Sequence, residues 1–489
     1  MAIGPKEEAH DCEWRDKAQT LEGEVSGLKD SVTRLESQLA ALTRQVFGKK
    51  SEKMPSLEKE LRDGQPIDAA TTQAKRQRRR EARENLLKVT TVHEVPPEKR
   101  RCPKCNGEKL SSLGAGKAST VFEYVPARFV AHHHIRQTLR CPCGGVVTAE
   151  GPEKWWEKSQ YGASFVAHLV TAKCADHNPL HRLEKEYLRI GIPVARSTMT
   201  DLFLRAAEVT APLSARLLEL IRNASHVHAD ETPKKVLAED KCRTGYMWNF
   251  RTTTPDALIA YVFSPTRSGE TPMRVLGGTK GELMADGYTG YNAVTEVDGR
   301  RRSACYAHVR RYFFDAIPTA PEAAEPLGLI RELYRVEREA HASGIFGTAE
   351  HLALRKKKSS GIRDKLEDWL RKAQGLHPPK SPLGAAIRYT LNRWNELGHF
   401  LEDALIRLDN NSSESALRRV ALGRKNFLFV GNDAAGEGLA GLYSLVATCE
   451  ANDINPTAYL TDVLIRLGTH PASLIDDLLP HRWSPRAVA

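Results

Sequence analysis

The sequence lacks any apolar run of about 18 residues, the length that a membrane-spanning helix needs. Its longest apolar stretch, near Leu439–Cys449, has the length of a buried helix, so we expect no membrane span. The polar, acidic N-terminus lacks the pattern of a secretory signal, which predicts no export. Nine cysteines, an odd number in 489 residues, argue against a secreted disulfide scaffold and favour a reducing cytoplasm.

Positive charge and a sizeable core are what the composition does provide. Lys and Arg total 72 against 61 Asp and Glu, and the excess of +11 is clustered along the chain. Clustered positive charge favours an anionic partner such as DNA. Apolar residues make up 41% of the chain, and its length suggests about three domains. We therefore expect a multidomain α+β protein.

A heptad pattern occupies the N-terminal region and predicts a dimerisation helix over residues 14–54. Leu at the d positions and mostly Val at the a positions favour a parallel two-stranded coiled coil, hence a homodimer or higher oligomer. The alternative is an amphipathic helix that packs on its own domain. The apolar residues follow one another in alternating steps of four and three: Trp14, Ala18, Leu21, Val25, Leu28, Val32, Leu35, Leu39, Leu42 and Val46.

A basic linker is predicted over residues 55–94. Six basic residues and one acid lie within residues 75–83. Such a run binds DNA phosphates without reading the base sequence, and its alternative is a solvated, flexible arm. The candidate DNA contacts are Arg76, Arg78, Arg79 and Arg80.

Two close cysteine pairs predict a zinc-ribbon-like domain over residues 95–150. Cys102 and Cys105 have two residues between them, and Cys141 and Cys143 have one. Two such pairs in Pro- and Gly-containing turns provide four thiolates for a tetrahedral, structural Zn²⁺. The alternative is four unrelated buried cysteines.

A helical segment over residues 160–215 precedes a region of alternating polarity. Helices are predicted over Leu180–Arg189 and Ser197–Ala207, and the Gly-Ile-Pro turn between them suggests a helix-turn-helix that binds DNA. The alternative is simple helix packing.

The alternating pattern that follows predicts short strands over Ser225–Ala229, Tyr246–Thr252, Leu258–Phe263, Glu282–Ala285 and Ser303–Tyr306. Helices follow to about residue 400, then a helix over 411–422, a strand over Phe427–Val430 and tail helices near 436–450 and 456–467.

Three carboxylates stand at positions that suit a catalytic metal centre. Asp230 and Asp286 each end a predicted strand, and Glu414 lies within a predicted helix. Two Mg²⁺ ions held by such acids cleave phosphodiesters, because they activate the attacking oxygen and stabilise the leaving one. Each acid alone is more often a turn residue. Asp409 is a rival third ligand, which we interpret as a helix N-cap.

These motifs, in this order, resemble transposases of the insertion sequence 66 family over nearly the whole chain. The resemblance rests on the coiled coil with Phe47–Lys53, the paired cysteines, His228–Thr232, Asp286–Tyr288, Cys305–Arg311, Asp409–Glu414 continuing to Phe429, and Tyr443–Leu460. It implies an RNase H-like α/β catalytic core over 220–430, a helical insertion at about 315–400 and a helical C-terminal piece over 431–489. The family generally has two residues in the second cysteine pair, whereas this chain has one.

The resemblance implies the chemistry of an Asp-Asp-Glu enzyme. Asp230, Asp286 and Glu414 would hold Mg²⁺ (or Mn²⁺), cleave the element ends and join them to target DNA. Small accessory proteins of the same element would be partners. Arg418 lies one helical turn beyond Glu414 and can pair with it. Arg418, Arg419, Arg424 and Lys425 would neutralise DNA phosphates. The alternative is a dimeric, zinc-containing DNA-binding regulator without catalysis.

Overall fold

The computed structural model describes residues 128–140, 142–143, 146–239, 241–253, 256–295 and 299–486, with isolated positions 73, 77, 80, 81 and 84. The predicted coiled coil over 14–54 lies outside the described residues, as does most of the basic linker. Residues 55–133 form one compact unit, and residues 134–489 belong to another. Within the described residues, no helix combines the length and apolarity needed to cross a membrane.

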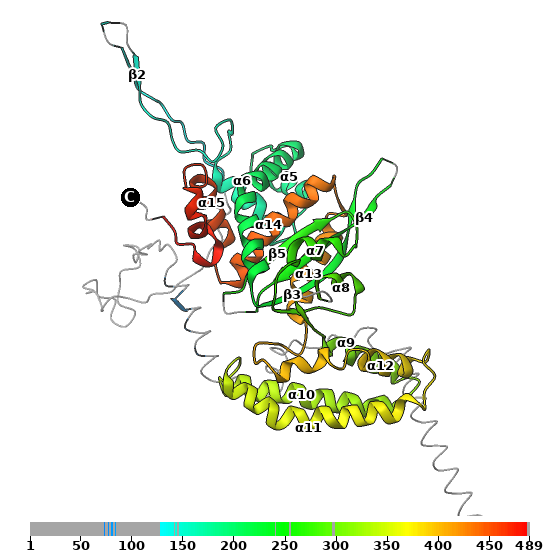
Figure 1. Cartoon of the computed structure of the whole chain (residues 1–489). Helices are drawn as coiled ribbons and strands as arrows, with labels where there is room; N and C mark the ends of the chain where they lie inside the picture. The colour runs from blue at the N-terminus through cyan, green and yellow to red at the C-terminus, as the bar shows by residue number, and fades with distance from the viewer. Residues whose placement is uncertain are drawn as a thin grey trace, which may run out of the picture. The chain divides into compact units, whose positions relative to one another are not determined.

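A mixed six-stranded sheet forms the centre of the larger unit (Figure 1). Its strand order is β5-β4-β3-β6-β7, and the two-residue β8 pairs with β3 as well. β3, β4 and β5 run antiparallel, whereas β6 and β7 run parallel to β3. The strands are β3 (His226–Val236), β4 (Arg243–Arg251), β5 (Ile259–Ser264), β6 (Glu282–Met284), β7 (Arg301–Ser303) and β8 (Phe429–Val430).

Two strand predictions differ from the structure. β3 does not end before Asp230 but continues to Val236, because β4 pairs with it along the whole distance from His228 to Val236. The strand predicted over Ser303–Tyr306 lies earlier, over Arg301–Ser303, and a helix begins at Tyr306. Asp230 therefore lies in the middle of β3.

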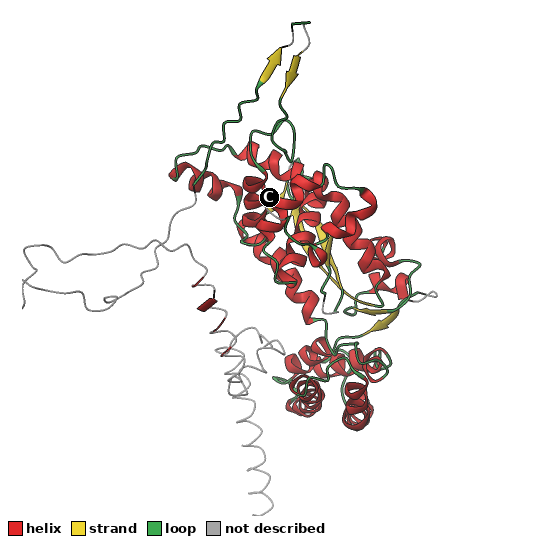
Figure 2. Cartoon of the chain, turned by 90° about the vertical axis from the view of Figure 1, so that its left-hand side faces the viewer, coloured by secondary structure: helices red, strands yellow, loops and turns green. Residues whose placement is uncertain are grey.

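Of the helices around this sheet (Figure 2), α6 (Arg196–Asn223), α13 (Asn411–Asn426) and α14 (Asp433–Ala451) pack on its strands, and α4 (Ala163–Cys174), α5 (Leu180–Arg189) and α15 (Pro456–Arg466) pack on α6 and α14 or on one another. α6 is much longer than the predicted segment, because Leu213, Leu217 and Ile221 continue its buried stripe beyond Pro212. Between β5 and β7 lie the shorter α7 (Glu270–Leu276) and α8 (Asn292–Thr295).

Helix α14 covers the outer edge of the sheet. The backbone amide groups of Ile259 and Tyr261 on β5 donate to the hydroxyls of Thr448 and Ser444, at 3.1 and 2.8 Å. An edge strand otherwise presents unpaired amides that attract another chain. These two hydroxyls of α14 therefore close the sheet at β5.

A helical insertion separates β7 from α13, in yellow to amber at the bottom of Figure 1. It consists of α9 (Tyr306–Ala316), α10 (Ala324–Ala342), α11 (Ala349–Gln374) and α12 (Pro382–Leu391). Two 3₁₀ turns, at Pro321–Ala323 and Glu396–Leu401, belong to the same insertion. Arg355 of α11 is fully buried and pairs with Glu337 of α10 at 2.6 Å. A buried pair of this kind holds the two long helices in one register.

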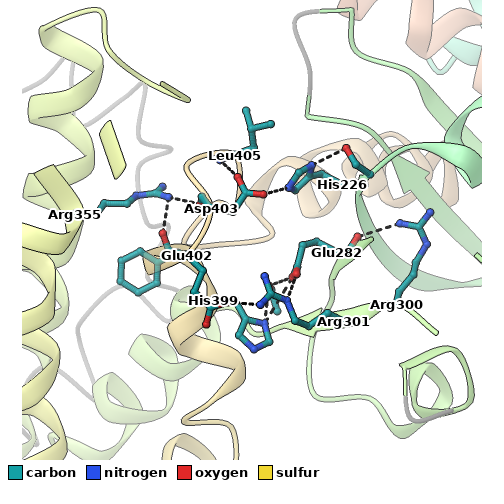
Figure 3. A network of polar contacts seen from close by, with 12 residues as sticks. His226, Glu282, Arg300, Arg301, Arg355, His399, Glu402, Asp403 and Leu405 are labelled. Carbon is teal, nitrogen blue, oxygen red and sulfur yellow. Dashed lines mark hydrogen bonds and ion pairs between the residues drawn. The ribbon is translucent and has the colours of Figure 1, made fainter. Parts of the chain in front are cut away.

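Polar contacts join the insertion to the sheet (Figure 3). Arg355 Nη1 donates to the carbonyl oxygens of Phe400 and Asp403, at 2.9 and 3.0 Å. The Asp403 carboxylate contacts His226 Nε2 of β3 at 2.8 Å. Arg301 of β7 pairs with both Glu282 and Glu402. The segment that leads into α13 is thus fixed to the sheet and to α11 at once.

Part of the predicted zinc domain is described. Strands β1 (Thr138–Arg140) and β2 (Val146–Thr148) form an antiparallel hairpin whose residues are all exposed. Cys143 lies in its turn and is exposed. Cys102, Cys105 and Cys141 lie outside the described residues.

Candidate active site

Asp230 and Asp286 lie on neighbouring parallel strands. The β3–β6 ladder ends with the pair His228 and Met284, and each aspartate follows its member of that pair by two residues. Corresponding positions on adjacent strands are about 5 Å apart. β6 ends at Met284, so Asp286 lies in the turn that follows this strand.

The carboxylates influence one another electrostatically. Burial is the largest cause that raises the pKa of Asp230 to about 8. The negative charge of the adjacent Glu231 raises it further, and so do the charges of Asp286 and Glu414. The fold therefore brings the third predicted acid, from a distant helix, within electrostatic range of the first.

Asn410 positions the helix that carries Glu414. It is fully buried and precedes α13, and its Nδ2 donates to the carbonyl oxygen of Ala229 at 2.8 Å. Its Oδ1 lies 3.1 Å from His228 Nδ1, and its backbone amide donates to Cys305 Sγ. One side chain thus fastens the start of α13 to β3 directly beside Asp230.

The protonation state of His228 follows from these contacts. The Asn410 amide nitrogen already donates to a carbonyl, so Asn410 Oδ1 must accept, and His228 Nδ1 carries the proton. Burial holds the pKa of His228 well below its usual value, and nearby Arg407 acts in the same direction. His228 is consequently a neutral, structural residue of the site.

Glu414 lies among residues of α9. Its Oε1 is 3.9 Å from His308 Nε2, and its Oε2 is 3.8 Å from Arg311 Nη2. Within the described residues, Cys305, His308 and Glu414 form the one group of three potential ligands whose atoms all lie within 4.8 Å. The predicted pair of Glu414 with Arg418 is absent from the described contacts, since α9 occupies the space beside this carboxylate.

Two networks stabilise the aspartates. Glu231, next to Asp230, accepts hydrogen bonds from Arg267 Nε and from the Tyr291 hydroxyl, both at 2.8 Å. The Asp286 carboxylate accepts from the backbone amide of Tyr288 at 2.9 Å, which fixes the turn after β6. The predictions from sequence missed Glu231, Arg267 and Asn410; the only signal was that Glu231 and Asn410 lie inside the quoted motifs.

The predicted DNA contacts have different environments. Arg418 and Lys425 are exposed on α13, whereas Arg424 is half-buried and donates to the Pro233 carbonyl oxygen at 2.7 Å. Arg419 points elsewhere, since it donates to the Cys174 carbonyl oxygen and pairs with Glu450. The expectation that Arg419 binds phosphate is wrong for this reason.

The basic arm is described only in part. Arg80 is exposed and pairs with Glu84 at 2.8 Å, and Arg76, Arg78 and Arg79 lie outside the described residues.

Asp409, interpreted above as the N-cap, accepts from the Asn411 amide at 3.1 Å and from the Tyr334 hydroxyl at 2.9 Å. Asn410 is the N-cap residue, so Asp409 stands one position before it, in contact with α10.

The donor set fits hard divalent cations. Three carboxylates provide the oxygen ligands that Mg²⁺ and Mn²⁺ prefer. Glu414 Oε1 is buried without a hydrogen-bond partner, and Asp230 gives up its proton with difficulty beside two other acids. A bound cation would give Glu414 Oε1 a partner and would neutralise the negative charges around Asp230.

Comparisons with known proteins agree with the sequence motifs. The family described as "Transposase IS66 family" matches residues 158–438, and the "IS66 C-terminal element" matches 444–481. The "zinc-finger binding domain of transposase IS66" matches 99–144, and the family described as "Transposase C of IS166 homeodomain" matches 34–95. The zipper and zinc-finger regions are thus those of this family.

Relatives that match over nearly their whole length extend the agreement. The uncharacterized protein y4hP of Sinorhizobium fredii is 30% identical over 504 residues, which cover 94% of this chain and 90% of that protein. The uncharacterized protein y4jD of the same organism is also 30% identical, over 96% of this chain and 98% of its own length. On these matches and the order of its domains, the chain belongs to the IS66 family of transposases.

Proposed function

We propose that this protein is a DNA transposase that cuts phosphodiester bonds at the ends of an insertion element and joins them to target DNA. Asp230, Asp286 and Glu414 are its metal-binding carboxylates. The observation that carries the proposal is geometric: Asp230 and Asp286 follow the last paired residues of two neighbouring parallel strands, and Asn410 fastens the start of the helix of Glu414 to Ala229, next to Asp230. The three acids lie far apart in the sequence, so a fold that brings them toward one another is expected where they act as one site.

The sheet supports an RNase H-like core. Three antiparallel strands, β3 to β5, stand on one side, and β6 and β7 continue the sheet on the other, parallel to β3. The first acid then lies on the central strand, the second after its parallel neighbour, and the third on a helix packed against β3. This arrangement supports the RNase H-like core that the family resemblance implies.

Each residue of the site would have its own role in the reaction. Bound Mg²⁺ or Mn²⁺ would lower the pKa of the attacking oxygen and stabilise the leaving one. Asp230 and Asp286 would hold cations from the sheet, and Glu414 from α13. Asn410 keeps α13 in place, and Arg311 is placed to attract a DNA phosphate toward the acids.

The reaction would proceed in two displacements. Water attacks the phosphorus at the element end, the bond from phosphorus to the 3′-oxygen breaks, and that oxygen takes up a proton to become a 3′-hydroxyl. The 3′-hydroxyl then attacks a phosphorus of target DNA, and the displaced target oxygen leaves as a new 3′-hydroxyl. Neither step needs a covalent bond to the protein.

The remaining regions would bind and pair the DNA ends. The helix over 14–54 would hold two protomers together, so that two element ends are joined in one complex. Cys102, Cys105, Cys141 and Cys143 would bind one structural Zn²⁺. The linker over 55–94, the helices within 160–215, and Arg418, Arg424 and Lys425 would contact DNA. Small accessory proteins of the same element would complete the assembly.

Cleavage of a labelled duplex carrying the DNA that flanks the gene tests the proposal. We expect cleavage with Mg²⁺ or Mn²⁺, and a loss of at least about 100-fold for Asp230→Asn, Asp286→Asn and Glu414→Gln. Asp364→Asn, at an exposed position of α11, is the matched control and should cleave normally. Unchanged cleavage by Asp230→Asn would overturn the assignment.

A further inference from the structure

Two stacked tyrosines lie on the insertion beside the carboxylates. Tyr312 of α9 and Tyr389 of α12 have ring centroids 4.5 Å apart and planes inclined by 28°. Tyr312 is 42% exposed, whereas Tyr389 is half-buried. The pair therefore presents an aromatic surface to solvent on a rigid base of two packed helices.

Arg393 connects this stack to the turn that carries Asp286. Its guanidinium lies 4.4 Å from the centre of the Tyr389 ring, and its Nη2 donates to the Gly287 carbonyl oxygen at 3.0 Å. A Cβ at Gly287 would lie 2.5 Å from Arg393 Nη2, so a larger residue there would displace this guanidinium. Arg393 thus holds the Tyr312–Tyr389 stack at a fixed position relative to Gly287, the residue that follows Asp286.

Helix α9 also reaches the third acid. Arg311, the residue before Tyr312, is 60% exposed at its side chain and lies 3.8 Å from Glu414. Two guanidinium groups thus belong to this region: Arg311 adjoins Tyr312 in the sequence, and Arg393 lies over the Tyr389 ring on which Tyr312 stacks. An aromatic face with basic neighbours is the combination that binds single-stranded nucleic acid: the ring stacks on a base and the cations contact the phosphates.

We propose that Tyr312, supported by Tyr389 and Arg393, stacks on an unpaired base of the DNA strand next to the phosphate that is cut. This inference rests on the proposed function, because it takes Asp230, Asp286 and Glu414 as the cutting site. A base inside a duplex exposes only its edges, and stacking on Tyr312 requires a free face. The duplex must therefore open at the element junction, and the stack stabilises the opened form.

Fluorescence of 2-aminopurine measures base stacking directly. The probe is a duplex of the DNA that flanks the gene, mismatched over the three nucleotides on each side of the cleaved bond, with 2-aminopurine placed in turn at each of these unpaired and therefore fluorescent positions. The full-length protein is used with Ca²⁺, in place of Mg²⁺, to slow cutting. We expect at least one position to lose fluorescence on binding to the wild type and to Tyr312→Phe, and to regain it with Tyr312→Ala.

Phe314→Ala is the matched control. Phe314 lies on the same helix with 41% exposure, but two residues further along, which turns it by about 200°. We expect Tyr312→Ala to weaken binding of a duplex with an unpaired junction roughly 5- to 100-fold, and Phe314→Ala to leave it unchanged. A duplex closed at the junction by a covalent cross-link should show no difference between these proteins.

The outcomes separate the two proposals. If Tyr312→Ala and the wild type quench 2-aminopurine equally and bind the open junction equally, the stacking inference is wrong, while cleavage that depends on Asp230 still supports the proposed function. If Asp230→Asn cleaves normally, the proposed function fails whatever Tyr312 does. Equal loss of binding in Tyr312→Ala and Phe314→Ala would show damage to α9 and overturn the stacking role.

Discussion

Replacing Asp230 by Asn should stabilise the protein at alkaline pH in the absence of added Mg²⁺. Burial and neighbouring acids raise the pKa of Asp230 from 3.8 to about 8. Between these values the unfolded chain has lost the proton that the folded chain retains, so wild-type stability falls as pH rises from about 4 to about 8. The amide of Asn carries no charge and escapes this loss.

The magnitude follows from the shift. About four pKa units at roughly 1.4 kcal/mol each set a ceiling of about 5–6 kcal/mol above pH 8. An amide at the same position still loses hydration, which costs about 1–3 kcal/mol. We therefore expect Asp230→Asn to gain about 2–5 kcal/mol at pH 8.5 and nothing at pH 4.5.

Urea denaturation of both proteins at pH 4.5 and 8.5 measures this gain. Glu337→Gln is the control, because Glu337 is an acid more deeply buried than Asp230 but its pKa is lowered, with Arg355 as its main partner. That substitution should destabilise the protein at pH 8.5. A denaturation midpoint of Asp230→Asn that equals or falls below the wild type at pH 8.5 would refute the electrostatic account of the site.

Three further substitutions test the fold and the assembly. Gly281→Ala should lower the free energy of unfolding, measured in urea titrations, by about 2 kcal/mol or more. Gly281 has φ +122°, and an added Cβ would lie 2.3 Å from the Ser225 carbonyl oxygen. An unchanged denaturation midpoint would contradict this expectation. Arg355→Met should cost about 3–5 kcal/mol by leaving the Glu337 charge buried, and calorimetry would contradict it by finding no change. Leu28→Asp should convert the dimer to a monomer in light scattering, and a persistent dimer would rule out the coiled coil.

Elements with a strong apolar period were predictable from the sequence. The helix predicted over Leu180–Arg189 has these bounds in the structure, and the tail helix predicted to begin at Pro456 does so. In the second case Asn455 caps the helix, accepting from the amides of Thr457 and Ala458, and Pro456 occupies its first turn. Local signals of this kind need no tertiary context.

Elements that depend on a distant partner were not predictable. The part of β3 beyond Asp230 contains Pro233, Lys234 and Lys235, which do not resemble a strand, and pairing with β4 holds them extended. The same limit applies to Glu414: a helix diagram suggests Arg418 as its partner, but α9 supplies His308 and Arg311 instead. Tertiary packing overrides local preference at these places.

The site was predictable as a set of acids but not as a geometry. The motifs around Asp230, Asp286 and Glu414 identify candidates only when they are taken together and in this order. Nothing local indicates that Asn410 would fasten its helix to β3 through His228 and Ala229. That contact joins residues far apart in sequence, and only the folded chain brings it about.

Anomalous diffraction from crystals soaked in Mn²⁺ is the most direct measurement of the central claim. The account predicts density at about 2.0–2.3 Å from carboxylate oxygens of Asp230, Asp286 and Glu414, and no such density in Asp230→Asn. A manganese ion bound elsewhere, or bound by Glu414 with Cys305 and His308 but without either aspartate, would contradict it.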